Sequence, residues 1–180
     1  MVYRLDAGTV IDAEGNLVIE NLYSGSVSLK TQAQGLVSGY NSGSASPNSY
    51  SNVIEKFPFS SDANATDVGD LTTATLSGVG QSSGANGYIS GGRYLPPSTF
   101  TNTIEKFPFS TDANASDVGD LTESKYGASG QSSTSNGYTS GGSTPAASNK
   151  IEKFPFSSDA NASDIADLLG ALYNATGQQV

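Results

Sequence analysis

One stretch of seven residues, Ile54–Ser60 (IEKFPFS), limits what this chain can fold into because it occurs three times. It returns unchanged at 104–110 and 151–157, and an Asp-Ala-Asn-Ala segment follows each copy. Self-similarity at a fixed period of this size is typical of an array of supersecondary units. The sequence therefore predicts three tandem units of about 50 residues within 26–180.

Each unit is expected to be an antiparallel β-sheet, so that the fold class is all-β. Alternation along the repeated stretch puts Phe57 and Phe59 on one strand face and Ile54 on the other, which predicts a strand between two layers. Pro58 cannot donate a ladder hydrogen bond and is expected to end the strand. We expect Glu55 and Lys56 to pair between neighbouring copies. The equivalent aromatic residues of the later copies are Phe107, Phe109, Phe154 and Phe156.

Glycine pairs recur ahead of the repeated stretch, at Gly91-Gly92 and Gly141-Gly142, and the first equivalent is Gly39-Tyr40. A glycine pair at the end of a short strand allows a turn with positive φ or a close approach of another backbone. Polar loops of variable length follow these pairs, and such loops normally lie on one exposed face.

The two ends of the chain carry patterns of their own. Residues 9–19 predict a β-hairpin around Gly15-Asn16, within an N-terminal docking segment that covers 1–25. Residues 165–176 fit either a short amphipathic helix capped by Ser163 or a strand and loop. We favour the strand because the spacing from Asp167 to Gln178 matches that in the two earlier units. Gly177-Gln178 would then begin a fourth unit.

The order of these segments resembles the kelch repeat of β-propellers. On this resemblance Gly91, Gly92, Gly141 and Gly142 match the glycine doublets, and each unit would be a propeller-like blade. The Trp that usually follows the turn in kelch repeats is absent. The aromatic residue of the third kelch strand would be Phe57, Phe107 and Phe154.

The sequence of the repeats, EKFPF followed by DANASDVGDL, also resembles that of repeat proteins of tailed bacteriophages, particularly marine ones. This resemblance implies a virion structural or fibre-like protein. Propellers close with about four to eight blades, and three blades leave open sheet edges that invite pairing with another chain. We therefore expect a homo-oligomer, such as a six-bladed ring of two chains or a bundle of three, that also contacts other virion proteins. A compact monomer is the alternative.

Composition restricts the chemistry that is available. The chain has no His and no Cys, so the usual catalytic triads and most zinc sites cannot be built. A net charge of −9 without a basic stripe argues against nucleic acid, and no apolar run is long enough for membrane insertion. Paired carboxylates could cleave a glycosidic bond, but the candidates recur in each unit, whereas a catalytic site is normally unique. We predict no enzyme, no cofactor and no catalytic residue; the carboxylates considered are Asp67, Asp70, Asp117 and Asp120.

Calcium binding is a weaker possibility. Asp62 and Asn64 have the spacing of a calcium loop, but the glycine and the bidentate glutamate of such a loop are missing. A turn in which Asp and Asn side chains bond the nearby backbone is favoured. The calcium candidates in the later copies are Asp112, Asn114, Asp159 and Asn161.

Binding through the variable loops is the main alternative function. Exposed aromatic side chains can stack on sugar rings or fill a partner's pocket, and they could equally pack on their own loops or on a sister subunit. The leading hypothesis is a non-enzymatic virion structural protein of a tailed phage, in its capsid, tail or fibre, that acts as an oligomeric β scaffold. The alternative is a carbohydrate-binding module for host recognition that presents Tyr40, Tyr50, Arg93, Tyr94 and Phe100.

Overall fold

The computed structural model describes residues 3–4, 9–11, 17–19, 38–42, 50–94 and 99–178, and within these ranges every regular element is a β-strand. The all-β expectation is therefore confirmed for the described part of the chain. No helix there is long and apolar enough to cross a membrane. The chain divides into two units, of which one comprises Met1–Gly39 with Pro58–Asp62 and the other Tyr40–Phe57 with Ala63–Val180.

The N-terminal strands form a three-stranded antiparallel sheet of order β1-β2-β3. The strands are β1 (Tyr3–Arg4), β2 (Thr9–Ile11) and β3 (Leu17–Ile19). Thr9 pairs with Ile19 and Ile11 with Leu17, so the two β-branched runs predicted to form a hairpin do pair with each other.

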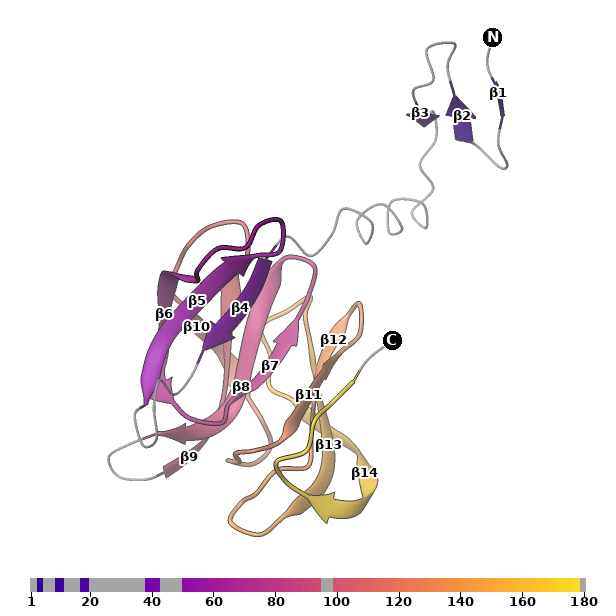
Figure 1. Cartoon of the computed structure of the whole chain (residues 1–180). Helices are drawn as coiled ribbons and strands as arrows, with labels where there is room; N and C mark the ends of the chain where they lie inside the picture. Colours follow the sequence, from indigo (N-terminus) through magenta and orange to yellow (C-terminus); the bar gives the residue numbers. More distant parts are fainter. Residues whose placement is uncertain are drawn as a thin grey trace. The chain divides into compact units, whose positions relative to one another are not determined.

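From β4 onward the described residues form three antiparallel sheets (Figure 1). The first sheet has the order β4-β5-β6, the second β10-β9-β8-β7 and the third β11-β12-β13-β14, so each is a meander of consecutive strands. The strands of the first and second sheets are β4 (Ser38–Ser42), β5 (Ser51–Pro58), β6 (Thr66–Thr75), β7 (Val79–Ser82), β8 (Asn86–Tyr94), β9 (Thr99–Pro108) and β10 (Ser116–Asp120). Those of the third are β11 (Ser129–Ser132), β12 (Asn136–Ser140), β13 (Ser148–Pro155) and β14 (Ser163–Leu172).

The three copies of the repeated stretch occupy β5, β9 and β13, and these strands end at Pro58, Pro108 and Pro155. Because proline has no backbone N–H to give to the ladder, the pairing stops there in each sheet. The predicted strand and its predicted end are both confirmed. Phe59 lies beyond the end of β5 and is largely exposed.

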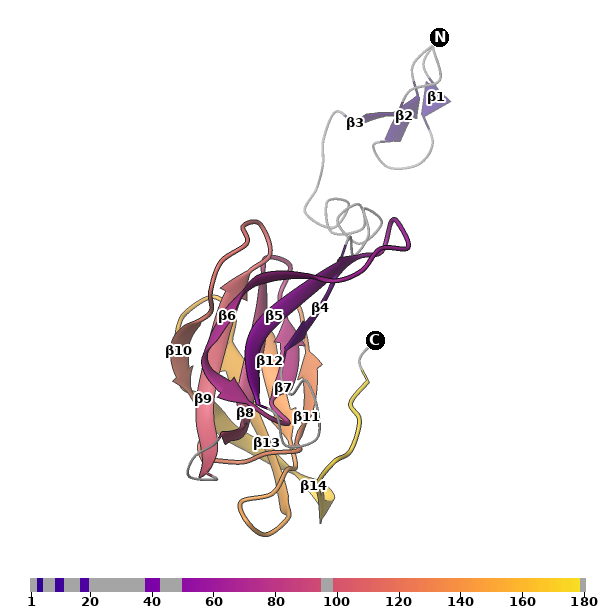
Figure 2. The same ribbon diagram turned by 60° about the vertical axis from the view of Figure 1, so that its left-hand side comes forward.

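Consecutive sheets face one another (Figure 2), and the hydrophobic core lies between them. Ile54 and Leu71 of the first sheet are buried against Phe107 of the second. Ile104 of the second sheet is in turn buried with Phe154 of the third. Ile104 and Phe107 thus pack toward different neighbours, as alternation along the strand predicts. Burial of a side chain of this size stabilises the fold by about 1.5–3 kcal/mol. Strand β9 therefore packs against both the first and the third sheet through its buried side chains.

The glycine pairs adopt the conformation expected of them. The φ angles are 62° and 117° at Gly91 and Gly92, and 69° and 97° at Gly141 and Gly142. In this region a side chain strains the backbone. The second glycine of each pair donates its N–H to a carbonyl further along the chain, that of Lys125 at 2.7 Å and that of Leu172 at 2.9 Å.

The C-terminal segment is a strand, β14, which confirms the prediction of a strand over a helix. No strand follows within 173–178, so the expected first strand of a fourth unit is not formed in the described residues. Ser129 Oγ nevertheless donates to the Ala175 carbonyl at 2.8 Å. A Cβ added at Gly177 would lie 2.5 Å from the Gly130 carbonyl oxygen, and a Cβ added at Gly130 would lie 2.2 Å from that of Gly80. The chain end therefore lies along β11 much as β11 lies along β7.

Close contact between the second and third sheets depends on Gly119. Its φ is 157°, and a Cβ added there would lie 2.6 Å from the Ala160 carbonyl oxygen. We predict that Gly119→Ala lowers the free energy of unfolding by about 1–3 kcal/mol, as overpacking typically does, measured by urea denaturation. Gly80→Ala is the control because a Cβ there has no atom within 4 Å. Equal stabilities of the two variants would contradict the packing described.

Candidate functional site

Two of the four carboxylates considered for catalysis, Asp67 and Asp117, bind the local backbone. Asp67 Oδ1 accepts the N–H of Gly69 at 3.1 Å, and Asp117 Oδ1 accepts that of Gly119 at 3.2 Å. Both hydrogen bonds span two residues, as expected of turn chemistry. The bonds fix a bulge at which β6 and β10 shift register against their partner strands. These aspartates therefore have a structural use in each unit.

The calcium candidates of the second and third copies contact the preceding sheet. Asp112 lies 3.3 Å from Lys56 Nζ, and Asp159 lies 2.5 Å from Lys106 Nζ. Asp62 and Asn64 are exposed. Among the described residues no group of three or more acidic side chains could hold a metal ion.

The asparagines of the same loops show where sequence reasoning was incomplete. Asn114 Oδ1 accepts the N–H of Asp70, and Asn161 Oδ1 accepts that of Asp120, both at 3.0 Å. The expectation that Asn114 and Asn161 would bond nearby backbone was wrong, because their amide oxygens reach the preceding sheet. In the sequence, only the regular spacing of the copies pointed to this contact. Spacing alone does not show which atom of the preceding sheet the amide oxygen binds.

The glutamates of the second and third copies of the repeated stretch also bind the preceding sheet. Thr72 donates its N–H and its Oγ1–H to Glu105, both at 2.8 Å. Thr122 donates in the same way to Glu152 at 2.6 Å. Glu55 and Lys56 were expected to pair between neighbouring copies. Both residue types do contact a neighbouring sheet, but the glutamates pair with threonines and the lysines with loop aspartates.

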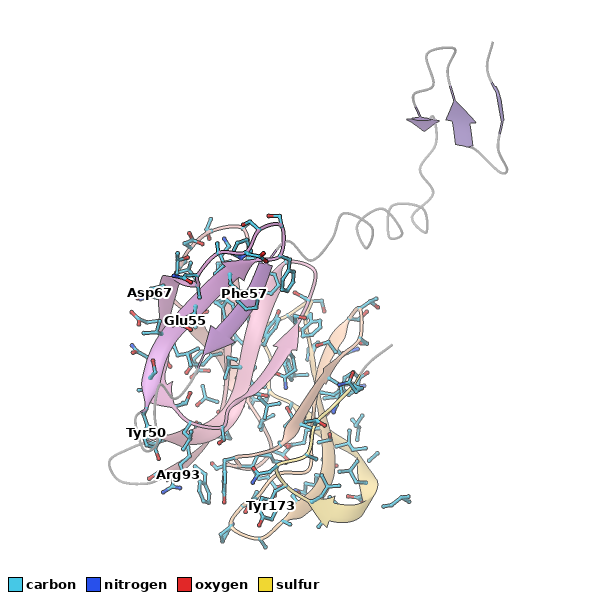
Figure 3. All side chains as sticks on the ribbon, viewed as in Figure 1. Tyr50, Glu55, Phe57, Asp67, Arg93 and Tyr173 are labelled. Atoms are coloured by element: carbon cyan, nitrogen blue, oxygen red, sulfur yellow. The ribbon has the colours of Figure 1, made fainter. Side chains whose placement is uncertain are left out.

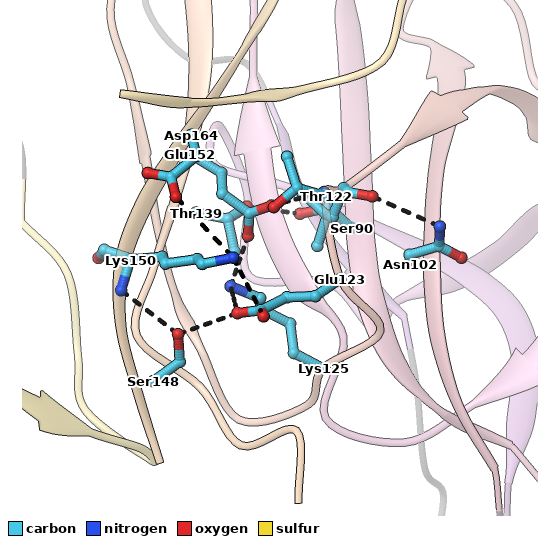
Figure 4. A network of polar contacts seen from close by, with 12 residues as sticks. Ser90, Asn102, Thr122, Glu123, Lys125, Thr139, Ser148, Lys150, Glu152 and Asp164 are labelled. Carbon is cyan, nitrogen blue, oxygen red and sulfur yellow. Dashed lines mark hydrogen bonds and ion pairs between the residues drawn. The ribbon is translucent and has the colours of Figure 1, made fainter. Parts of the chain in front are cut away.

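A buried ionic cluster lies between the second and third sheets (Figure 4). The side chains of Lys125 and Glu152 are 1% and 0% exposed, and Lys125 Nζ lies 2.5 Å from Glu152 Oε2. Glu123 contributes a second carboxylate 3.3 Å from the same Nζ and also accepts a hydrogen bond from Ser148. Buried charges are tolerated only when paired in this way. The sequence did not identify Lys125, for which the first copy has Thr75.

A network of uncharged polar side chains lies between the second and third sheets near β7. Gln81 Nε2 donates to Ser90 Oγ in its own sheet at 2.8 Å and to Thr139 Oγ1 in the third sheet at 3.0 Å. Ser90 and Thr139, both labelled in Figure 4, are fully buried. Satisfied buried networks of this kind fix one arrangement of the packed layers.

The residues considered for glycan binding do not form one surface, and the expectation that Arg93, Tyr94 and Phe100 lie in a loop was wrong because they belong to β8 and β9. Arg93 pairs with Phe100 and Tyr94 with Thr99 across the β8–β9 ladder, and adjacent pairs face opposite sides of a sheet. Phe100 therefore shares a face with Arg93 and not with Tyr94. Its ring packs on Tyr126 with centroids 4.8 Å apart. Tyr50 and Arg93 are half-buried (Figure 3), and the side chain of Tyr40 lies outside the described residues.

Two groups at the edge of the ionic cluster have shifted pKa values. Burial would raise the pKa of Glu123, but the hydrogen bond from Ser148 and the ammonium groups of Lys125 and Lys150 hold it below the usual 4.5. The hydrogen bond to Glu123 raises the pKa of Lys150 above 10.5 against the effect of burial, and the nearby carboxylates add to that rise. Folding thus favours the charged forms of both groups.

A scan against protein-family models finds no match to this chain, and a search of curated proteins finds no similar sequence.

The low pKa of Glu123 predicts a pH dependence of stability. A group with a lowered pKa in the folded state stabilises the fold above its unfolded pKa, and this contribution is lost as pH falls through the folded pKa. Wild type should therefore exceed Glu123→Gln in free energy of unfolding at pH 7, and the difference should shrink as pH falls below 4.5. Denaturation at a series of pH values measures this. A difference that stays constant with pH would contradict the assignment.

Proposed function

We propose that this chain is a non-enzymatic structural protein, an oligomeric β scaffold of a tailed-phage virion. One observation carries the scaffold role: the polar residues that recur with each copy of the repeated stretch are used to bind neighbouring sheets. Their repetition then needs no catalytic explanation, because the second and third copies each bind the sheet that precedes them.

The two junctions use the same types of contact. Lys56–Asp112 and Lys106–Asp159 are equivalent ion pairs. Exposed ion pairs contribute little to the free energy of unfolding. Their role here is to fix the alignment of each sheet with the next. The hydrogen bonds to Glu105 and Glu152 join buried carboxylates to the preceding sheet. A carboxylate held by donors in this way is poorly placed to act on a substrate.

We further propose that the three sheets are kelch-like blades of a propeller-type array. In support, β7 of the second sheet lies beside β11 of the third, and β6 of the first lies beside β10 of the second. First strands therefore neighbour first strands and last strands neighbour last strands, as in blades stacked around an axis. The glycine doublets and the signature strands supply the resemblance in sequence.

The assignment to a virion is supported by the resemblance of the EKFPF and DANASDVGDL segments to tailed-phage repeat proteins. An assembly role is also consistent with the exposed apolar side chains at the end of the described sheets, among them Ile165 and Leu169. Solvent-exposed apolar groups that cluster in this way mark surfaces that bind other macromolecules.

The proposal predicts that the purified chain is an oligomer. We expect light scattering coupled to size-exclusion chromatography to give a mass that is a multiple of 18.4 kDa and that falls on dilution if assembly is reversible. A single-chain mass at every concentration would contradict the scaffold role. Glycan binding by such a monomer, lost on Phe100→Ala but kept on Tyr94→Ala, would favour the carbohydrate-binding alternative.

A further inference from the structure

Lys125 and Glu123 are charged residues at positions where the first unit carries the threonines Thr75 and Thr73. Both belong to the buried ionic cluster, and the side chain of Lys125 is only 1% exposed. The removal of an ammonium group from water is costly, and the first junction has Thr75 buried in its place. A residue that only the fold of a unit needs is expected to recur with the unit. These two charges therefore require a separate explanation.

The carboxyl group of Glu152 is held differently from its counterpart in the first junction. In Glu105 the two donors from Thr72 are divided between the two carboxylate oxygens. In Glu152 both donors from Thr122, its N–H and its Oγ1–H, bind Oε1 at 2.6 Å. The other oxygen, Oε2, accepts no hydrogen bond of regular geometry from the described residues and lies 2.5 Å from Lys125 Nζ. One oxygen is thus fixed and polarised, and the other faces an amine.

We propose that Lys125 and Glu152 form an intramolecular isopeptide bond, by attack of Nζ on the side-chain carbonyl carbon, Cδ. Figure 4 shows the Lys125 ammonium group between the carboxylates of Glu152 and Glu123. Groups held in contact in this way react as if at very high concentration, because the entropy of bringing them together has already been lost. The bond joins the segment that follows β10 covalently to β13.

The atoms and protons of this step balance without a further reactant. Lys125 passes one proton directly to Glu152 Oε2, which leaves a neutral amine and a carboxylic acid. The amine attacks Cδ, and negative charge develops on Oε1, where the two donors of Thr122 stabilise it as an oxyanion hole does. Glu123 takes a second proton from the nitrogen and gives it to Oε2, which departs as water while the C=O bond re-forms. The products are an amide and one water molecule, and Glu123 is a carboxylate again.

Glu123 is held in the charged form that this proton transfer needs. Its Oε1 lies 3.3 Å from Lys125 Nζ and accepts a hydrogen bond from Ser148 at 3.0 Å, and its Oε2 lies 3.3 Å from Lys150 Nζ. Ser148 and Lys150 remain as its partners after Lys125 has lost its charge. The new amide also removes two charges from an interior site, where an ion pair loses hydration that its mutual attraction need not offset. The buried site therefore favours condensation.

The test is the intact mass of the full-length chain. We expect the purified wild-type chain to be lighter than its sequence mass by one water molecule, and a chymotryptic digest to contain a branched peptide that joins Lys125 to Glu152. Lys125→Arg keeps the charge but has no amine to form the bond, so it should show its full sequence mass. Lys150→Arg makes the same change at the other lysine of the cluster and should still lose the water. Circular dichroism checks that both variants are folded.

A wild-type chain at its full sequence mass would overturn the proposal, as would a loss of water that persists in Lys125→Arg. If Lys125→Arg does not fold, Lys125→Thr, which has the residue of the first junction, takes its place as the unlinked variant.

Glu123→Gln tests the proton transfer, with the linked fraction followed over time after cell-free synthesis of the chain. This variant should form the bond at least about 100-fold more slowly than wild type, as loss of a general acid–base group typically causes. Bond formation at the wild-type rate would overturn the role given to Glu123.

Discussion

The structure depends on a loop that completes the backbone bonding of the sheet before it. The Asp70 N–H is satisfied by Asn114, and the Asp70 carbonyl accepts the N–H of Ala115 at 2.8 Å. Asn161 and Ala162 do the same for Asp120. A buried or half-buried backbone group without a partner is costly. Consecutive sheets of this Gly- and Ser-rich chain are therefore joined by backbone hydrogen bonds as well as by the apolar residues between them.

The two junctions share this frame but differ in their interiors. Between the first and second sheets the position equivalent to Lys125 is Thr75, which is buried. Between the second and third sheets Lys125 adds a buried charge that Glu152 and Glu123 compensate. Replacement of one partner of such a pair is costly, whereas a well-packed neutral group can serve as well. The ionic cluster thus makes the second junction distinct from the first although the surrounding sequence repeats.

Local patterns predicted the features that depend on local geometry. Alternation gave the opposite directions of Ile104 and Phe107, and the missing N–H of Pro108 gave the end of β9. Long-range partners could not be predicted, because a period shows that Asn114 recurs and not that its amide reaches Asp70. The same limit applied to Tyr94 and Phe100, whose separation onto two faces follows from the register of the β8–β9 ladder. The virion, kelch and oligomer assignments remain proposals.

Amide hydrogen exchange at Asp70 and Asp120 tests most directly whether these loops join the sheets. Asp70 N–H bonds to Asn114 and Asp120 N–H to Asn161, so both should exchange slowly in the wild-type chain. In Asn114→Ala the Asp70 N–H should exchange faster while the Asp120 N–H stays protected. Unchanged protection at Asp70, or an equal loss at both amides, would contradict it.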